Sequence, residues 1–118
     1  MILADTSVWI DHFKRSDEQL SDLLQRSEVL IHPFVIGELA LGGLTASSQH
    51  LLAELPGAAV ASHDEVMHAI ASRQLARRGI GYVDAHLIAA VVLTSGARLW
   101  TRDARLRTVA EDLDVAVG

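Results

Sequence analysis

The chain contains no cysteine, a single lysine (Lys14) and only two prolines among its 118 residues. Without cysteine, disulfide bonds and thiolate metal ligands are excluded, so any bound metal would need oxygen or histidine ligands. The scarcity of proline leaves long stretches free to form helices, and half of the residues are hydrophobic. This composition predicts a packed helical or α/β core, and the length predicts one domain over residues 1–118.

The sequence also lacks a long apolar run. No stretch approaches the roughly 20 apolar residues that span a bilayer, and the amino terminus has no basic segment followed by an apolar one. We therefore expect no membrane partner and a cytoplasmic location, with which the absence of cysteine is compatible.

Positive charge and aromatic residues are scarce as well. The net charge is −5 and the pI is near 5.6, so the protein as a whole is not an electrostatic nucleic-acid binder, and any such contact must be local. At 4% aromatic residues the chain offers few stacking platforms, and Tyr82 is assigned a hydrophobic role at a helix start. The basic side chains available for a local contact are Arg73, Arg77, Arg78, Arg98, Arg102, Arg105 and Arg107.

Short apolar runs alternate with segments of helical periodicity. This alternation predicts a parallel sheet covered by helices. The runs that predict strands are 2–4, 29–31, 58–60 and 97–100, with 115–117 as an edge strand. Two helices are expected between the first two strands, with Thr6 or Ser7 as the first cap, and the later ones are expected over 34–44, 47–55, 64–78, 82–95 and 103–113.

Four acidic residues stand at or beside the predicted passages from strand to helix. Asp5 and Asp103 follow strands, Asp84 lies in the first turn of a helix and Glu38 lies in mid-helix. In an open α/β sheet, sites form at the carboxyl ends of the strands. Carboxylates gathered there would repel one another unless a cation offset their charge, which favours a hard divalent metal.

The residues around these acids resemble the PIN-domain family, and within it the VapC toxins of bacterial toxin–antitoxin pairs. The resemblance rests on LADTSVWI at 3–10, Gly37 to Leu39 with Gly42 beyond, DAHLIAA at 84–90 and LWTRD at 99–103. No single motif is specific, but their order and spacing cover nearly the whole chain.

The resemblance implies a three-layer α/β/α sandwich with a short parallel central sheet. It also implies an endoribonuclease dependent on Mg²⁺ or Mn²⁺, usually a homodimer and inhibited by a VapB-like antitoxin. The family's acidic positions, which would be both catalytic and metal-binding, fall on Asp5, Glu38, Asp84 and Asp103, and its hydroxyl positions fall on Thr6 and Thr101.

Other classes of protein also gather acids at strand ends. A phosphate-accepting signalling domain would place a lysine after a late strand, whereas Lys14 lies in the first helix; an aspartyl phosphatase would place Asp where Ser7 stands. A non-catalytic module that binds a protein partner through apolar helix faces remains open, with Phe34, Leu41 and Leu44 as its contact residues.

The histidines do not form a convincing zinc motif. The closest pair, His63 and His68, has a five-residue spacing that suits one helix face poorly. His86 lies two residues after Asp84 and so points away from it, which predicts a packing or interface role.

Overall fold

The structure, a computed structural model, describes residues 1–117 and has a three-stranded parallel sheet at its centre. The strand order is β2-β1-β3, with β1 at Ile2–Ala4, β2 at Val29–Leu30 and β3 at Arg98–Trp100. Leu3 of β1 pairs with Leu30 on one side and Leu99 on the other, and all three are buried. A sheet covered on both faces favours such continuous apolar runs.

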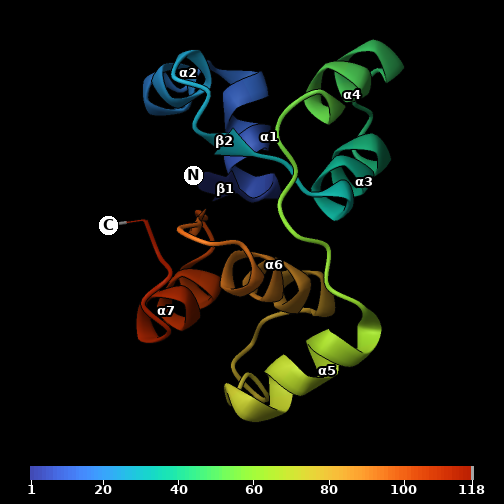
Figure 1. Cartoon of the computed structure of the whole chain (residues 1–118). Coiled ribbons are helices and arrows are strands. Elements are labelled where there is room, and N and C mark those ends of the chain that lie inside the picture. The colour runs from blue at the N-terminus through green and yellow to red at the C-terminus, as the bar shows by residue number, and fades with distance from the viewer. Residues whose placement is uncertain (118) are drawn as a thin grey trace.

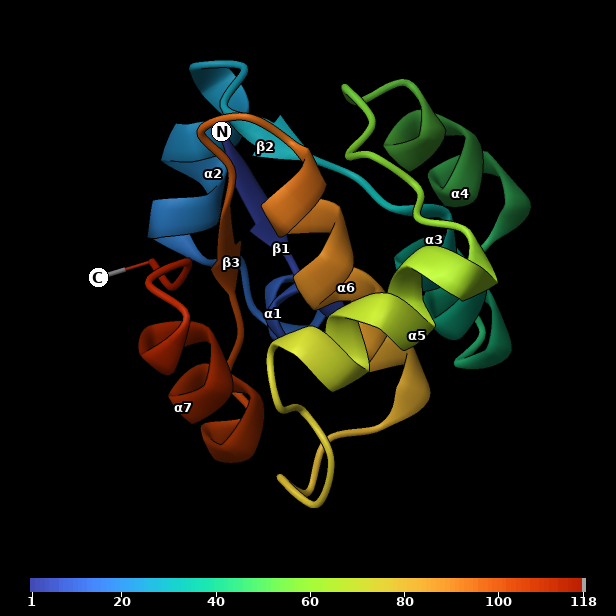
Figure 2. The same ribbon diagram turned by 60° about the horizontal axis from the view of Figure 1, so that its bottom comes forward.

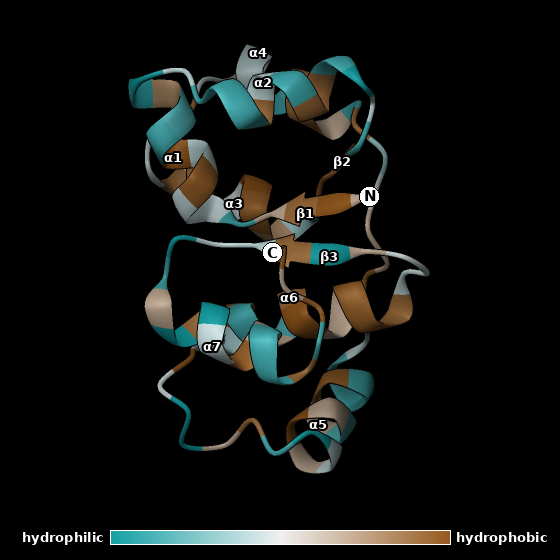
Figure 3. Cartoon of the chain, turned by 90° about the vertical axis from the view of Figure 1, so that its left-hand side faces the viewer, coloured by the Kyte–Doolittle hydropathy of each residue, from teal (hydrophilic) through white to brown (hydrophobic). Residues whose placement is uncertain are grey.

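Helices cover both faces of this sheet. Figures 1 and 3 show α1 to α4 on one side of the strands and α5 to α7 on the other. The predicted three-layer α/β/α sandwich is therefore confirmed. The helix bounds are α1 Thr6–Lys14, α2 Glu18–Gln25, α3 Pro33–Leu41, α4 Ala46–Ala53, α5 His63–Ser72, α6 Tyr82–Leu93 and α7 Ala104–Asp112.

The route of the chain makes β1 the central strand. Helices α1 and α2 connect β1 to β2, and α3 to α6 return the chain to β3 on the other side of β1 (Figure 2). The residue after β1, Asp5, therefore lies between the two helix layers, at the edge of the sheet where α1 and the loop into α7 begin.

Helix α6 forms much of the core beneath the sheet. Every residue from 85 to 91 is buried, because β3 contacts the helix on one side and α5 contacts it on the other. Figure 3 shows its hydrophobic colouring, in contrast to the mixed surface of α7. A helix buried on nearly all sides has little amphipathic periodicity.

Two predicted strands are wrong. Residues 58–60 form no strand, and just before them Gly57 makes a single bridge to Ile31. The residue after Ile31, His32, already caps α3, so no further strand is there for residues 58–60 to pair with. The segment 115–117 likewise meets β3 at a single bridge between Leu99 and Ala116, after a turn at Asp114 with φ of 58°.

The helix predicted over 64–78 ends six residues early, at Ser72. Gln74 and Arg77 have φ values of 55° and 62°, in the left-handed region, which a right-handed helix does not contain. The turn this makes buries Leu75, whose N–H donates to the Ile70 carbonyl at 3.0 Å. Burial of one leucine thus overrides the amphipathic pattern.

None of the helices described over residues 1–117 combines the length and the apolar character needed to cross a membrane.

The contribution of the buried sheet to stability is testable with a matched pair of leucines. Leu99 is 1% exposed in β3, and Leu41 is 92% exposed at the end of α3. Leu99→Ala should lower the free energy of unfolding by about 2–5 kcal/mol, because it leaves a cavity. Leu41→Ala should change it by less than about 0.5 kcal/mol. Urea unfolding measures both, and equal effects would contradict this packing.

Candidate active site

Asp5 is the most firmly held of the four acids. It is 5% exposed and is itself the N-cap of α1, so the expected capping by Thr6 or Ser7 is wrong. Its Oδ1 accepts from the Ser7 hydroxyl at 2.5 Å and from the Val8 N–H at 3.3 Å. Its Oδ2 accepts from the Thr101 hydroxyl. Both oxygens are thus satisfied, as a buried carboxylate requires.

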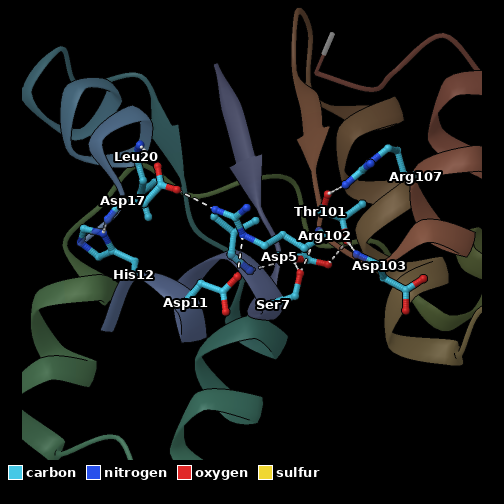
Figure 4. A network of polar contacts seen from close by, with 11 residues as sticks. Asp5, Ser7, Asp11, His12, Asp17, Leu20, Thr101, Arg102, Asp103 and Arg107 are labelled. Carbon is cyan, nitrogen blue, oxygen red and sulfur yellow. Dashed lines mark hydrogen bonds and ion pairs between the residues drawn. The ribbon is translucent and has the colours of Figure 1, made fainter. Parts of the chain in front are cut away.

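The two hydroxyls that hold Asp5 are themselves fixed by the loop after β3. Ser7 Oγ accepts from the Arg102 N–H and Thr101 Oγ1 accepts from the Asp103 N–H, each at 3.0 Å. Each hydroxyl accepts a backbone N–H and donates its single hydrogen to Asp5, which therefore acts purely as an acceptor. Figure 4 shows Ser7 and Thr101 beside Asp5 in this network.

Ser7 is a site residue that the sequence analysis did not assign. The sequence offered it only as a helix cap and as the residue that stands where a phosphatase would have Asp. The informative pattern is a hydroxyl two residues after an N-cap aspartate, where the side chain returns to the cap. Its second contact, to the loop after β3, joins residues 95 positions apart and has no local sequence pattern.

Thr6 contacts a different acid from the one beside it. Its hydroxyl donates to Glu38 Oε1 at 2.6 Å and so joins α1 to α3. Glu38 is exposed, in the second half of α3. The hydrogen bond directs its carboxylate toward the start of α1, where Asp5 lies.

The charges of the other three acids affect the pKa of Asp84. It lies in the first turn of α6, where its Oδ2 accepts from the Gly81 N–H at 3.1 Å. Burial raises the pKa of Asp84, and the charges of Asp103, Asp5 and Glu38 raise it further, against the lowering effect of the Gly81 hydrogen bond. The four acids therefore share one electrostatic field.

Asp103 completes the set at the start of α7. As the N-cap of that helix, its Oδ1 accepts from the Leu106 N–H at 2.9 Å, and the residue is exposed. One oxygen of Asp103 is thus occupied in capping α7.

No arginine or lysine pairs with these four acids among residues 1–117. Arg102, which follows Thr101, is paired away from them: its Nε lies 2.8 Å from Asp11 and its terminal nitrogen 2.6 Å from Asp17 (Figure 4). That Asp17 carboxylate, capping α2 and bonded to Arg102, has a lowered pKa, chiefly through the Leu20 N–H. The four acids are left without a protein counter-charge.

The donors available at this site are carboxylate oxygens, the ligands that Mg²⁺ and Mn²⁺ prefer. Within residues 1–117, no three histidine or acidic side chains are arranged closely enough to hold an ion as they stand. Asp5 is fixed, whereas Glu38 and Asp103 are exposed and project from helices. The oxygen donors fit a divalent cation in chemistry. Bringing them within reach of one ion would require the exposed side chains of Glu38 and Asp103 to turn toward Asp5.

The buried histidines have structural roles. His32 caps α3 through Nδ1, which accepts from the Phe34 N–H at 3.0 Å, and burial, aided by His86, lowers the pKa of His32 to about 4. His86 is 4% exposed, which confirms its predicted packing role. Burial, and then the charge of His63, lower the pKa of His86.

Comparison with known proteins decides the family. Residues 2–112 match the family model described as PIN domain. The chain belongs to the PIN-domain family. Two curated relatives of this PIN-domain chain are Ribonuclease VapC32 of Mycobacterium tuberculosis strains CDC 1551 / Oshkosh and ATCC 25618 / H37Rv. Each is 47% identical over 119 residues, covering 99% of this chain and 96% of the relative.

Among solved structures, the chain is similar to PAE2754 from Pyrobaculum aerophilum. The TM-score is 0.57 at 21% identity, covering 95% of this chain and 85% of the other. At that identity the likeness concerns the fold, which agrees with the sandwich of Figure 1.

The raised pKa of Asp84 predicts that Asp84→Asn stabilises the metal-free protein at pH 7. At that pH the folded state holds a carboxylate among three others, and the amide removes the repulsion while still accepting from Gly81. The gain should shrink as pH falls through the raised pKa of the folded chain, and it should vanish only below 3.8, where Asp84 is protonated in the folded and the unfolded chain. Thermal melting in chelator between pH 4 and pH 7 measures it.

The control is Asp64→Asn, which alters a first-turn aspartate of α5. It should slightly lower the melting temperature, because a carboxylate at a helix N-terminus is favourable. An Asp84→Asn variant that melts below wild type at pH 7 would contradict the account.

Proposed function

We propose that this protein, a single PIN-like domain, is a cytoplasmic endoribonuclease that uses Mg²⁺ or Mn²⁺ to hydrolyse RNA phosphodiester bonds. We further propose that it is the toxin of a toxin–antitoxin pair. The observation that carries the proposal is the set of four acids, which share one field without a protein counter-charge.

In this proposal Asp5, Glu38 and Asp84 form the ligand core, and Asp103 completes the site directly or through water. When bound, a divalent cation there would activate water and neutralise charge on the phosphate oxygens. Asp5, held on both oxygens, would present its carboxylate without a change of rotamer. The Thr6 hydroxyl would hold Glu38 across the site from α6.

The relatives support the same activity. Both curated relatives carry the name Ribonuclease VapC32 at 47% identity over nearly the full chain. An RNA substrate and a VapB-like antitoxin are therefore the partners we propose.

Exposed apolar side chains support protein partners. Ile10 and Phe13 of α1 are 41% and 47% exposed, and together with Leu39 and Leu44 they line a cavity of about 340 Å³ that reaches Glu38. Such patches mark interaction sites on small proteins. We propose that the antitoxin and a second copy of the chain cover apolar surface of this kind.

The competing function is a non-catalytic binding module. Leu41 is 92% exposed and Phe34 is 36% exposed, which such a module could use, while Leu44 is half-buried. A module of that kind has no need for a buried carboxylate held by two hydroxyls, and chelation should leave its binding unchanged.

The test of the function is RNA cleavage by purified protein. Mixed cellular RNA should be cut with Mg²⁺ or Mn²⁺ and left intact with chelator. Asp5→Asn and Asp84→Asn should each reduce the rate by at least about 100-fold, because even residues that only support a metal ligand commonly contribute 10- to 100-fold.

Asp64→Asn, an aspartate outside the acid set, serves as the matched control and should cut at the wild-type rate. Cleavage by Asp5→Asn at that rate would show the active-site assignment to be wrong. Wild-type cleavage that persists in chelator would disprove the metal requirement.

A further inference from the structure

Four rings form a continuous row across three helices near the acids. Phe34 of α3 lies 4.5 Å from His86 of α6, measured between ring centroids, and His86 lies 4.7 Å from Tyr82. Tyr82 in turn lies 5.9 Å from His63 of α5. Three separate elements thus contribute to one aromatic row in a chain that has only two Phe, one Tyr and two Trp.

The row presents ring surface to solvent on a rigid support. His86 is 4% exposed and lies between Phe34 and Tyr82, which are 36% and 46% exposed. The Tyr82 hydroxyl and His63 Nδ1 are 2.7 Å apart, a hydrogen bond that fixes the outer ring. Because nearly half of Tyr82 is exposed to solvent, the hydrophobic role expected for it at the helix start accounts for only part of its surface.

The row borders the acid set through Phe34. Phe34 precedes Glu38 by four residues in α3, so the two project from one helix face one turn apart. Tyr82 lies two residues before Asp84 in the first turn of α6, so its ring points away from that carboxylate and joins the row through His86, 4.7 Å away. A polymer whose phosphate reached the acids would therefore bring its adjoining groups to the rings.

Arginines without an ion pair within residues 1–117 lie in the segment before α6 and in α7. Arg73 and Arg77 lie in the segment between α5 and Tyr82, and neither they nor Arg105 forms an ion pair within residues 1–117. Arg105 packs on Gly79 of this segment, where an added Cβ would lie 2.7 Å from its Cδ. These guanidinium groups are available to phosphates flanking the acids.

We propose that Tyr82 and Phe34 form a platform on which a base of the RNA stacks beside the scissile phosphate. This inference rests on the proposed ribonuclease function and adds a substrate-binding contact to it. Unstacked bases of single-stranded RNA bind on Tyr, Phe and His rings, and stacking tolerates any base.

The test uses a short single-stranded oligoribonucleotide, selected from a random-sequence pool as one that the wild type cuts, with Mn²⁺. Tyr82→Ala should raise KM about 5- to 150-fold, the range for loss of one stacked base, with kcat little changed. Tyr82→Phe keeps the ring and should stay within about threefold of wild type. Leu51→Ala, which removes an exposed apolar side chain in α4, is the control and should leave KM unchanged.

A substrate lacking one base beside the cut bond separates stacking from a structural role. Wild type should bind the abasic oligonucleotide about as weakly as Tyr82→Ala binds the intact one. Tyr82→Ala should lose little further affinity when the base is removed. Circular dichroism and melting confirm that each variant is folded.

Two results would overturn the platform while wild type still cuts RNA. One is an unchanged KM for Tyr82→Ala; the other is an abasic effect that is equal in wild type and Tyr82→Ala. If light scattering then shows that only Tyr82→Ala loses self-association, the rings belong to a protein contact. Failure of wild type to cut any RNA would instead refute the ribonuclease proposal itself.

Discussion

The hydrogen bonds that enclose the Asp5 carboxylate hold together the parts of the fold that meet at the sheet edge. Ser7 Oγ and Thr101 Oγ1 donate to it while accepting the N–H groups of Arg102 and Asp103. One side chain thus fixes the end of β1, the start of α1 and the loop from β3 into α7. A buried carboxylate left unpaired would be strongly destabilising, so the network and the packing around it form together.

The same site carries an electrostatic strain that the fold alone does not relieve. Burial and the three other acids raise the pKa of Asp84, while Arg102, which directly precedes Asp103, pairs with Asp11 and Asp17. A bound cation would offset this repulsion and so stabilise the folded chain. Hydroxyls and backbone N–H groups orient the acids, and in the proposed function a divalent cation supplies the positive charge that they lack.

Much of this could be predicted from the sequence because it follows from local patterns. The apolar runs ending at Asp5 and before Asp103 locate β1 and β3, and the first turn of α6 places Asp84. Glu38 was different, because it lies in mid-helix and no strand end or helix start marks its position. Its contact with Thr6 crosses 32 residues and has no local signature.

The failures have the same cause. The helix predicted to 78 stops at Ser72 because the chain turns to bury Leu75, and the strand predicted at 58–60 fails because its partner becomes the cap of α3 at His32. Tyr82 was assigned to packing because its exposed ring and its contact with His63 depend on how α5 meets α6. Tertiary placement, which periodicity does not encode, decided each case.

The account is tested most directly by a crystal structure of the protein grown with Mn²⁺ and measured for anomalous scattering from the metal. It predicts a Mn²⁺ peak bonded to a carboxylate oxygen of Asp5, with Glu38 and Asp84 turned toward the same ion and the Ser7 and Thr101 hydrogen bonds intact. A Mn²⁺ ion bound elsewhere, with no peak at Asp5 at saturating metal, would contradict it.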